Sequence, residues 1–118
     1  MAKGALFVGW GPLIPGREEA ARKVLGDAMQ YLQRLQREGE IDGFEAVALE
    51  PHGGDLNGFV LVKGEKEAIS RLRASGEFTR VAVRVQLVHS HVGVVGAYTG
   101  AEMQSLFETW DSEEDELI

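Results

Sequence analysis

Apolar residues recur every three or four positions between residues 17 and 38, the spacing that places side chains along one side of a helix. This stripe consists of Ala21, Val24, Leu25, Ala28, Leu32 and Leu35. Charged and amide side chains occupy most positions between them, and Gly39 follows as a residue that accepts the left-handed conformation at a helix end. The pattern therefore predicts an amphipathic helix over residues 17–38.

Three short apolar runs are typical of β-strands, and they comprise residues 5–8, 44–50 and 59–63. The first run ends in Gly9-Trp10-Gly11-Pro12, and glycine and proline commonly end a strand in a loop. Residues 51–58, between the second and third runs, are rich in turn formers. We therefore expect a hairpin loop there.

A shorter helical pattern covers residues 65–74, and Ser75-Gly76 interrupts it. The next segment, 78–87, fits two patterns: alternate apolar residues favour a strand, whereas apolar residues at three–four spacing favour a helix. A strand here would be joined to the next one by only two residues, neither of them a turn former. We therefore expect a helix over about 77–86 that continues into a strand over about 88–98.

The last apolar residues recur at helical spacing after Gly100 and lead into an acidic segment. They are Met103, Leu106, Phe107 and Trp110. We expect this helix to pack on the domain, since burying side chains of this size contributes about 1.5–3 kcal/mol each. The segment 111–118 adds only two apolar residues, so we expect a solvated acidic tail that folding does not need.

The predicted order is strand, helix, strand, strand, helix, strand, with the second helix split and an extra C-terminal helix. This is the βαββαβ order of the ferredoxin-like α+β fold, in which two helices cover one face of a four-stranded antiparallel sheet. The other face normally carries polar residues at alternate positions, but these strands are apolar on both faces. We therefore expect a homodimer that buries the helix-free sheet faces, broken by a charge at Val60 or Leu61, whichever points away from the helices.

Length and charge narrow the possible partners. The 118 residues fit one domain, placed at residues 1–110, with the acidic tail at 111–118. The net charge is −7, and six acids lie within residues 108–118, so the rest is close to neutral with 12 bases and 13 acids. Such a chain has no basic field for nucleic acid, and no apolar run reaches the roughly 18 residues of a membrane span. Without cysteine or a signal-peptide pattern, a cytoplasmic location is expected.

Histidines are the residues most suited to chemistry. His89 and His91 would share one side of an extended strand and supply two nitrogens to a metal, with His52 or Glu45 as a third ligand. Two imidazoles are half of a closed tetrahedral set, and no carboxylate lies at helical spacing from either, so we expect no metal and no cofactor. His52 is the candidate catalytic base, because loops often carry functional groups and imidazole exchanges protons near neutral pH. It could equally be a solvated loop residue.

Three aromatic residues, Trp10, Phe59 and Tyr98, are candidate ligand-binding residues. Amphipathic aromatic side chains often line pockets for small molecules. If the chain binds a small hydrophobic molecule, its pocket should lie between the sheet and the helices, although each ring could instead fill the core or an interface.

Residues 4–99 resemble one protomer of the dimeric α+β barrel superfamily. The resemblance rests on the order of elements and on the pattern Leu72-x-x-Ser75-Gly76-Glu77-Phe78, followed by a strand and Gly100. Many small uncharacterised bacterial proteins share it. The superfamily also includes cofactor-free monooxygenases of antibiotic biosynthesis, haem-binding relatives and stress-responsive proteins. The resemblance thus implies a fold and a dimer more than one reaction.

Two functions are compatible with these features. The first is a non-enzymatic homodimer that serves as a binding or assembly module, and the alternative is a cofactor-independent monooxygenase-like enzyme acting on a small hydrophobic molecule. A cavity that reaches solvent and holds converging polar groups would favour an enzyme or binder. Side chains that fill this space would favour an assembly module.

Overall fold

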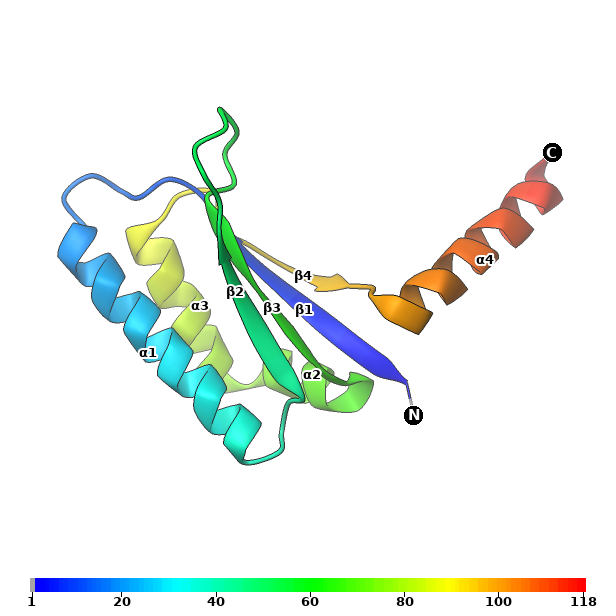
Figure 1. Cartoon of the computed structure of the whole chain (residues 1–118), viewed down its shortest axis with the longest axis horizontal. Helices are drawn as coiled ribbons and strands as arrows, with labels where there is room; N and C mark the ends of the chain where they lie inside the picture. The colour runs from blue at the N-terminus through cyan, green and yellow to red at the C-terminus, as the bar shows by residue number, and fades with distance from the viewer. Residues whose placement is uncertain (1) are drawn as a thin grey trace.

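The computed structural model describes residues 2–118, which form one antiparallel sheet and four helices (Figure 1). The elements are β1 (Lys3–Trp10), α1 (Glu18–Arg37), β2 (Gly43–Ala48), β3 (Gly58–Glu65), α2 (Lys66–Ala74), α3 (Gly76–Val88), β4 (Gly93–Ala97) and α4 (Gly100–Leu117). The strand order is β2-β3-β1-β4, and α1, α2 and α3 cover one face of the sheet. The predicted ferredoxin-like α+β fold is confirmed, as is the long first helix.

The register of the strands decides which side chains face the helices. Leu6 pairs with Val62 and Val8 pairs with Val60, and all four side chains point toward the helical layer. Side chains alternate between the two faces of a strand, so the intervening residues of β1 and β3 face away from the helices. These positions also carry apolar residues. The helical layer completes the core with large apolar residues: Tyr31, Leu32, Leu35, Ile69, Leu72 and Phe78.

The predicted break between the second and third helices lies at Ser75. Its side-chain oxygen accepts a hydrogen bond from the backbone N–H of Phe78 at 3.1 Å, which caps the first turn of α3. The following segment is helical, so the helical interpretation of residues 78–87 is confirmed over the strand interpretation.

The strand expected over residues 88–98 is wrong in its first half. The helix α3 continues to Val88, and β4 begins only at Gly93. Between them His89 pairs with Leu13 in an isolated bridge, and His91 has a backbone φ of 53°. A residue with positive φ turns the chain out of the extended conformation, so these residues leave the sheet and join the loop after β1.

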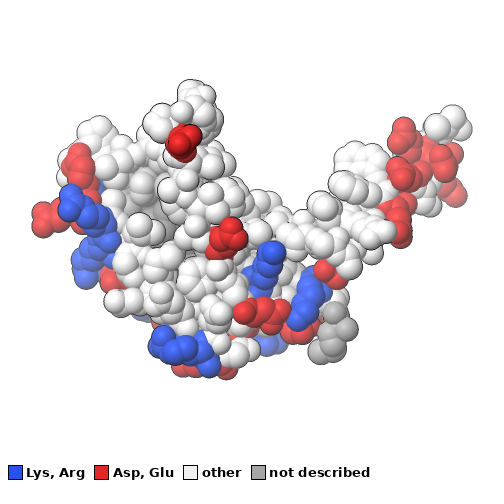
Figure 2. Space-filling view, viewed as in Figure 1, with Lys and Arg blue, Asp and Glu red and all other residues white. Residues whose placement is uncertain are grey.

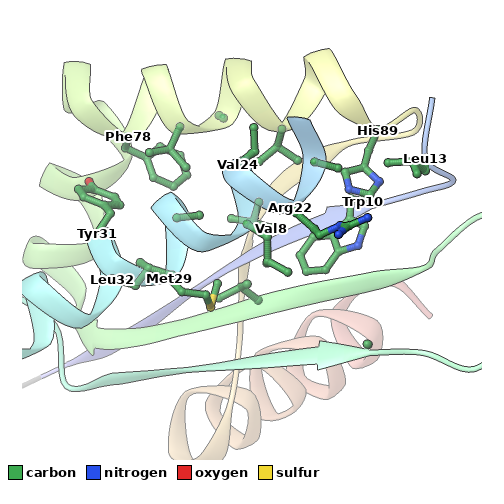
Figure 3. A pocket seen from close by; sticks show the side chains of 18 of the residues that line it. Val8, Trp10, Leu13, Arg22, Val24, Met29, Tyr31, Leu32, Phe78 and His89 are labelled. Atoms are coloured by element: carbon green, nitrogen blue, oxygen red, sulfur yellow. The ribbon is translucent and has the colours of Figure 1, made fainter. Parts of the chain in front are cut away.

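The C-terminal helix differs most from expectation. The acidic segment continues α4 to Leu117, and no residue of α4 is buried. The expected packing of this helix on its own domain is therefore wrong for the single chain. Figures 1 and 3 show α4 on the side of the sheet opposite to α1 and α3. None of the helices within residues 2–118 combines the length and the apolar character needed to cross a membrane.

Candidate functional site

A pocket of about 420 Å³ lies between the sheet and the helices α1 and α3 (Figure 3). Its floor comes from alternate residues of β1 and β3, and its walls come from the facing sides of the two helices. Nearly all of the lining is apolar. Glu18, Arg22 and Leu25 belong to the lining and are exposed, so the pocket reaches solvent beside the N-terminal half of α1.

The pocket exists because the facing helices carry short side chains at this end. Ala21 and Ala28 of α1 and Ala82 of α3 all line it. Farther along α1, the bulky Tyr31 and Leu32 close the far end of the pocket, and Leu35 lies in the core beyond it. Since protein interiors are close-packed only where side chains are large enough to interdigitate, the apolar stripe of α1 forms a pocket wall at one end and core at the other.

Polar groups gather at the end of the pocket near the loops (Figure 3). Trp10 ends β1, His89 follows α3, and Arg22 comes from α1. The rings of Trp10 and His89 lie with their centroids 6.0 Å apart. The Nδ1 atom of His89 is 3.0 Å from the carbonyl oxygen of Gly11. A carbonyl only accepts, so Nδ1 donates, and in the neutral ring Nε2 remains an acceptor.

The position of His89 depends on the close approach of two loops. The backbone N–H of Gly11 donates to the carbonyl oxygen of Ser90 at 2.8 Å. A Cβ atom at residue 11 would lie 2.7 Å from that same oxygen and 2.8 Å from the carbonyl oxygen of Asp55. Only glycine lets the chain pass this close, so Gly11 positions His89 through backbone contacts.

The opposite end of the pocket holds a phenol. Tyr31 is buried beside Phe78, and the guanidinium of Arg34 lies 5.5 Å from the centroid of its ring. Burial raises the pKa of Tyr31 above its usual value. The hydroxyl therefore stays protonated at neutral pH and keeps its capacity to donate a hydrogen bond.

The structure does not bring the three aromatic candidates together. Trp10 lines the pocket. Phe59 points to the other face of the sheet, where it stacks on Phe7 with ring centroids 5.2 Å apart. Tyr98 follows β4 and is exposed. Phe59 and Tyr98 thus lie outside this pocket.

The histidines are also separated. His52 is exposed in the loop between β2 and β3, with its Nδ1 atom 3.0 Å from the carbonyl oxygen of Glu50. His91 is exposed and does not extend the strand, so the expectation that it shares a strand face with His89 is wrong. Glu45 lies beside Leu61 on the helix-free face of the sheet. Within residues 2–118, no three histidine or carboxylate side chains come close enough together to bind a metal.

No pattern in the sequence predicted that His89, Arg22 and Tyr31 would line this pocket. The alanines within the helical stripe were a partial signal, because short side chains at core positions leave space. Which polar residues reach that space depends on how α1 and α3 pack together, and no local sequence pattern encodes this packing.

The helix-free face of the sheet is a second candidate surface. Phe7, Phe59 and Leu61 are partly exposed there, and Val95 of the edge strand β4 is exposed. Leu61 is therefore the residue that points away from the helices, whereas Val60 is only 5% exposed and lines the pocket. One sheet thus presents an internal pocket on one side and an open apolar face on the other.

Comparisons with known proteins identify the fold. No family model matches the sequence, and no curated protein matches it. A dimeric ferredoxin-like protein of unknown function from Jannaschia sp. CCS1 has a TM-score of 0.64 at 16% identity, covering 83% of this chain and 100% of that one. A dabb family protein with a ferredoxin-like fold from Mesorhizobium loti also has a TM-score of 0.64, at 11% identity, covering 84% and 99%. SnoaB, a cofactor-independent oxygenase from Streptomyces nogalater, has a TM-score of 0.51 at 15% identity, covering 86% and 98%.

Proposed function

We propose that this chain forms a homodimer and that each protomer binds a small hydrophobic molecule in the pocket between the sheet and α1 and α3. The observation that carries this proposal is a pocket of about 420 Å³ that reaches solvent, with an apolar lining and polar groups at its two ends. Ligand sites commonly combine these features. A protein that served only assembly would gain stability from filling this space with side chains.

Two observations support the homodimer. The helix-free face carries Phe7, Phe59, Leu61 and Val95, an apolar surface that a soluble monomer would leave in contact with water. In addition, the similar protein from Jannaschia sp. is described as dimeric. A second copy can cover this face while leaving the pocket open, because the pocket lies on the opposite side of the sheet.

Pocket binding can be tested with N-phenyl-1-naphthylamine, a neutral apolar dye whose fluorescence rises in apolar surroundings. We expect the wild-type protein to bind it and Ala28→Phe to bind it at least tenfold more weakly, because the added ring occupies the pocket. Ala74→Phe is the matched control, since Ala74 is exposed at the end of α2 and does not line the pocket. Ala21→Leu is a milder second variant, because overpacking can cost about 1–3 kcal/mol in stability. Equal dye affinity of wild type and both folded pocket variants would contradict binding in this pocket.

The arrangement of His89 and Arg22 favours a second candidate function, a cofactor-independent monooxygenase-like enzyme. The Nε2 atom of His89 can take a proton from a weakly acidic hydroxyl group, and the nearby cation of Arg22 would stabilise the resulting anion. The similar protein SnoaB is described as a cofactor-independent oxygenase.

Oxygen uptake tests this second function. With polycyclic phenols such as 1-naphthol and 1,5-dihydroxynaphthalene as probes, His89→Gln should lower the rate about 100-fold or more, since a positioned base typically contributes 10²–10⁴. His52→Gln and His91→Gln are controls with exposed imidazoles. Uptake that His52→Gln abolishes and His89→Gln leaves intact would assign the base to the loop instead.

A further inference from the structure

The C-terminal helix α4 carries an apolar stripe, and no residue of this stripe is buried within the single chain. Met103, Phe107 and Trp110 are exposed, the last two by 55% and 65%, and Leu106 is only partly covered. These four residues follow helical spacing and therefore lie on one side of α4. A stripe of this kind is the face by which an amphipathic helix packs against another surface.

The composition of α4 shows that it needs such a surface. Most helices in proteins owe their stability to the tertiary packing of an apolar face and less to the helix propensity of their residues. The last turn of α4 contains only acids among its charged residues, and negative charge at a helix C-terminus is unfavourable. Figure 2 shows these acids gathered at the outer end of the helix. The complementary surface should therefore be apolar where it meets the stripe and basic where it meets the C-terminal end of α4.

A second copy of this chain meets both requirements. The helix leaves β4 on the helix-free side of the sheet, where the partner of the proposed homodimer would lie. An 18-residue helix is about 27 Å long, and packed layers are about 10 Å apart. Hence α4 is long enough to pass the partner's sheet and reach its helical layer. The helices α1, α2 and α3 contain nine of the 12 lysine and arginine residues, against five acids.

We propose that α4 is an arm that packs along the second protomer, with the stripe Met103, Leu106, Phe107 and Trp110 against that protomer's sheet and the acidic end toward its helices. The proposal rests on the proposed homodimer and adds a second contact to the sheet face. Parallel pairing of the two arms would bring the acidic ends of both helices together, which like-charge repulsion disfavours. Antiparallel pairing would set each acidic end beside the other arm, which carries no lysine or arginine. The partner's helical layer is therefore the better-matched surface.

The experiment compares dimer dissociation constants by sedimentation equilibrium in the full-length protein. The double variant Phe107→Ser/Trp110→Ser should weaken the dimer at least tenfold. The control Gln104→Ser/Thr109→Ser places the same residue type on α4 away from the stripe, and it should stay within twofold of the wild type. Circular dichroism should show both variants folded, because α4 has no buried residue in the single chain.

A second measurement follows Trp110 directly. In a Trp10→Phe background, Trp110 is the sole tryptophan. Its emission should shift to shorter wavelength as the protomer concentration rises, with a midpoint that matches the sedimentation result. A dimeric wild type whose stripe and control variants dissociate alike, or whose Trp110 emission does not change, would overturn the arm while leaving the sheet-face dimer intact. A wild type that stays monomeric would overturn both proposals.

Discussion

Leu61→Asp should convert the proposed homodimer into monomers. Leu61 lies on the helix-free face of β3, opposite Phe7 of β1, near the middle of the sheet. Burying an unpaired charge costs several kcal/mol, and a twofold interface would bury two of them. Because 1.4 kcal/mol changes an equilibrium constant tenfold, the dissociation constant should rise at least 100-fold. Sedimentation should then report a mass near the 12.9 kDa of one chain instead of twice that value.

Two controls separate burial from other effects of this substitution. Leu61→Lys should dissociate the dimer as well, although lysine would sit beside Glu45 and gain a favourable neighbour. Val83→Asp, on the exposed surface of α3, should remain dimeric. If Leu61→Asp and Leu61→Lys both kept the mass of a dimer, the helix-free face would not be the interface.

Leu6→Ala should cause a large loss of folding stability. Leu6 is 1% exposed and packs in the core against Val62 and the helical layer. Removing a buried leucine to alanine typically costs 2–5 kcal/mol, because the transfer free energy is lost and a cavity remains. Against a total of about 5–15 kcal/mol for a domain, the urea midpoint should fall markedly.

The matched control is Leu87→Ala, which removes the same atoms from a side chain that is 55% exposed on α3. Exposed substitutions usually change stability by no more than about 0.5 kcal/mol. All variants should be compared at one protomer concentration, since dimerisation contributes to apparent stability. Similar urea midpoints for Leu6→Ala and Leu87→Ala would show that this part of the core is not packed as described.

The pocket residues could be predicted only in part. Trp10 was one of three aromatic candidates, chosen because amphipathic rings often line pockets for small molecules, with core filling as the alternative. His89 was considered for a metal, on the assumption that residues 88–98 were one strand. The helix continues to Val88 and the chain turns at His91, so His89 faces the pocket while His91 faces solvent. Backbone contacts between two loops, made through Gly11, decide this orientation.

The C-terminal helix shows a second limit of prediction from the sequence. Its apolar stripe was recognised correctly, and a stripe of this kind usually packs against another surface. The expectation that the surface lay within the same chain was wrong, since α4 points away from the helical layer and has no buried residue. Periodicity reveals which side of a helix is apolar, but it contains no information about which molecule covers that side.

The sequence by itself determined the element types, their order and the fold class, because hydrophobic periodicity and turn residues act over short distances along the chain. It also showed that both sheet faces are apolar. Only the tertiary structure decided that Val60 lines a pocket while Leu61 faces outward, and that Trp10, Arg22 and His89 meet at one end of that pocket. These facts depend on strand register and on how two helices pack over short alanine side chains. Both are set by contacts between residues far apart in the sequence.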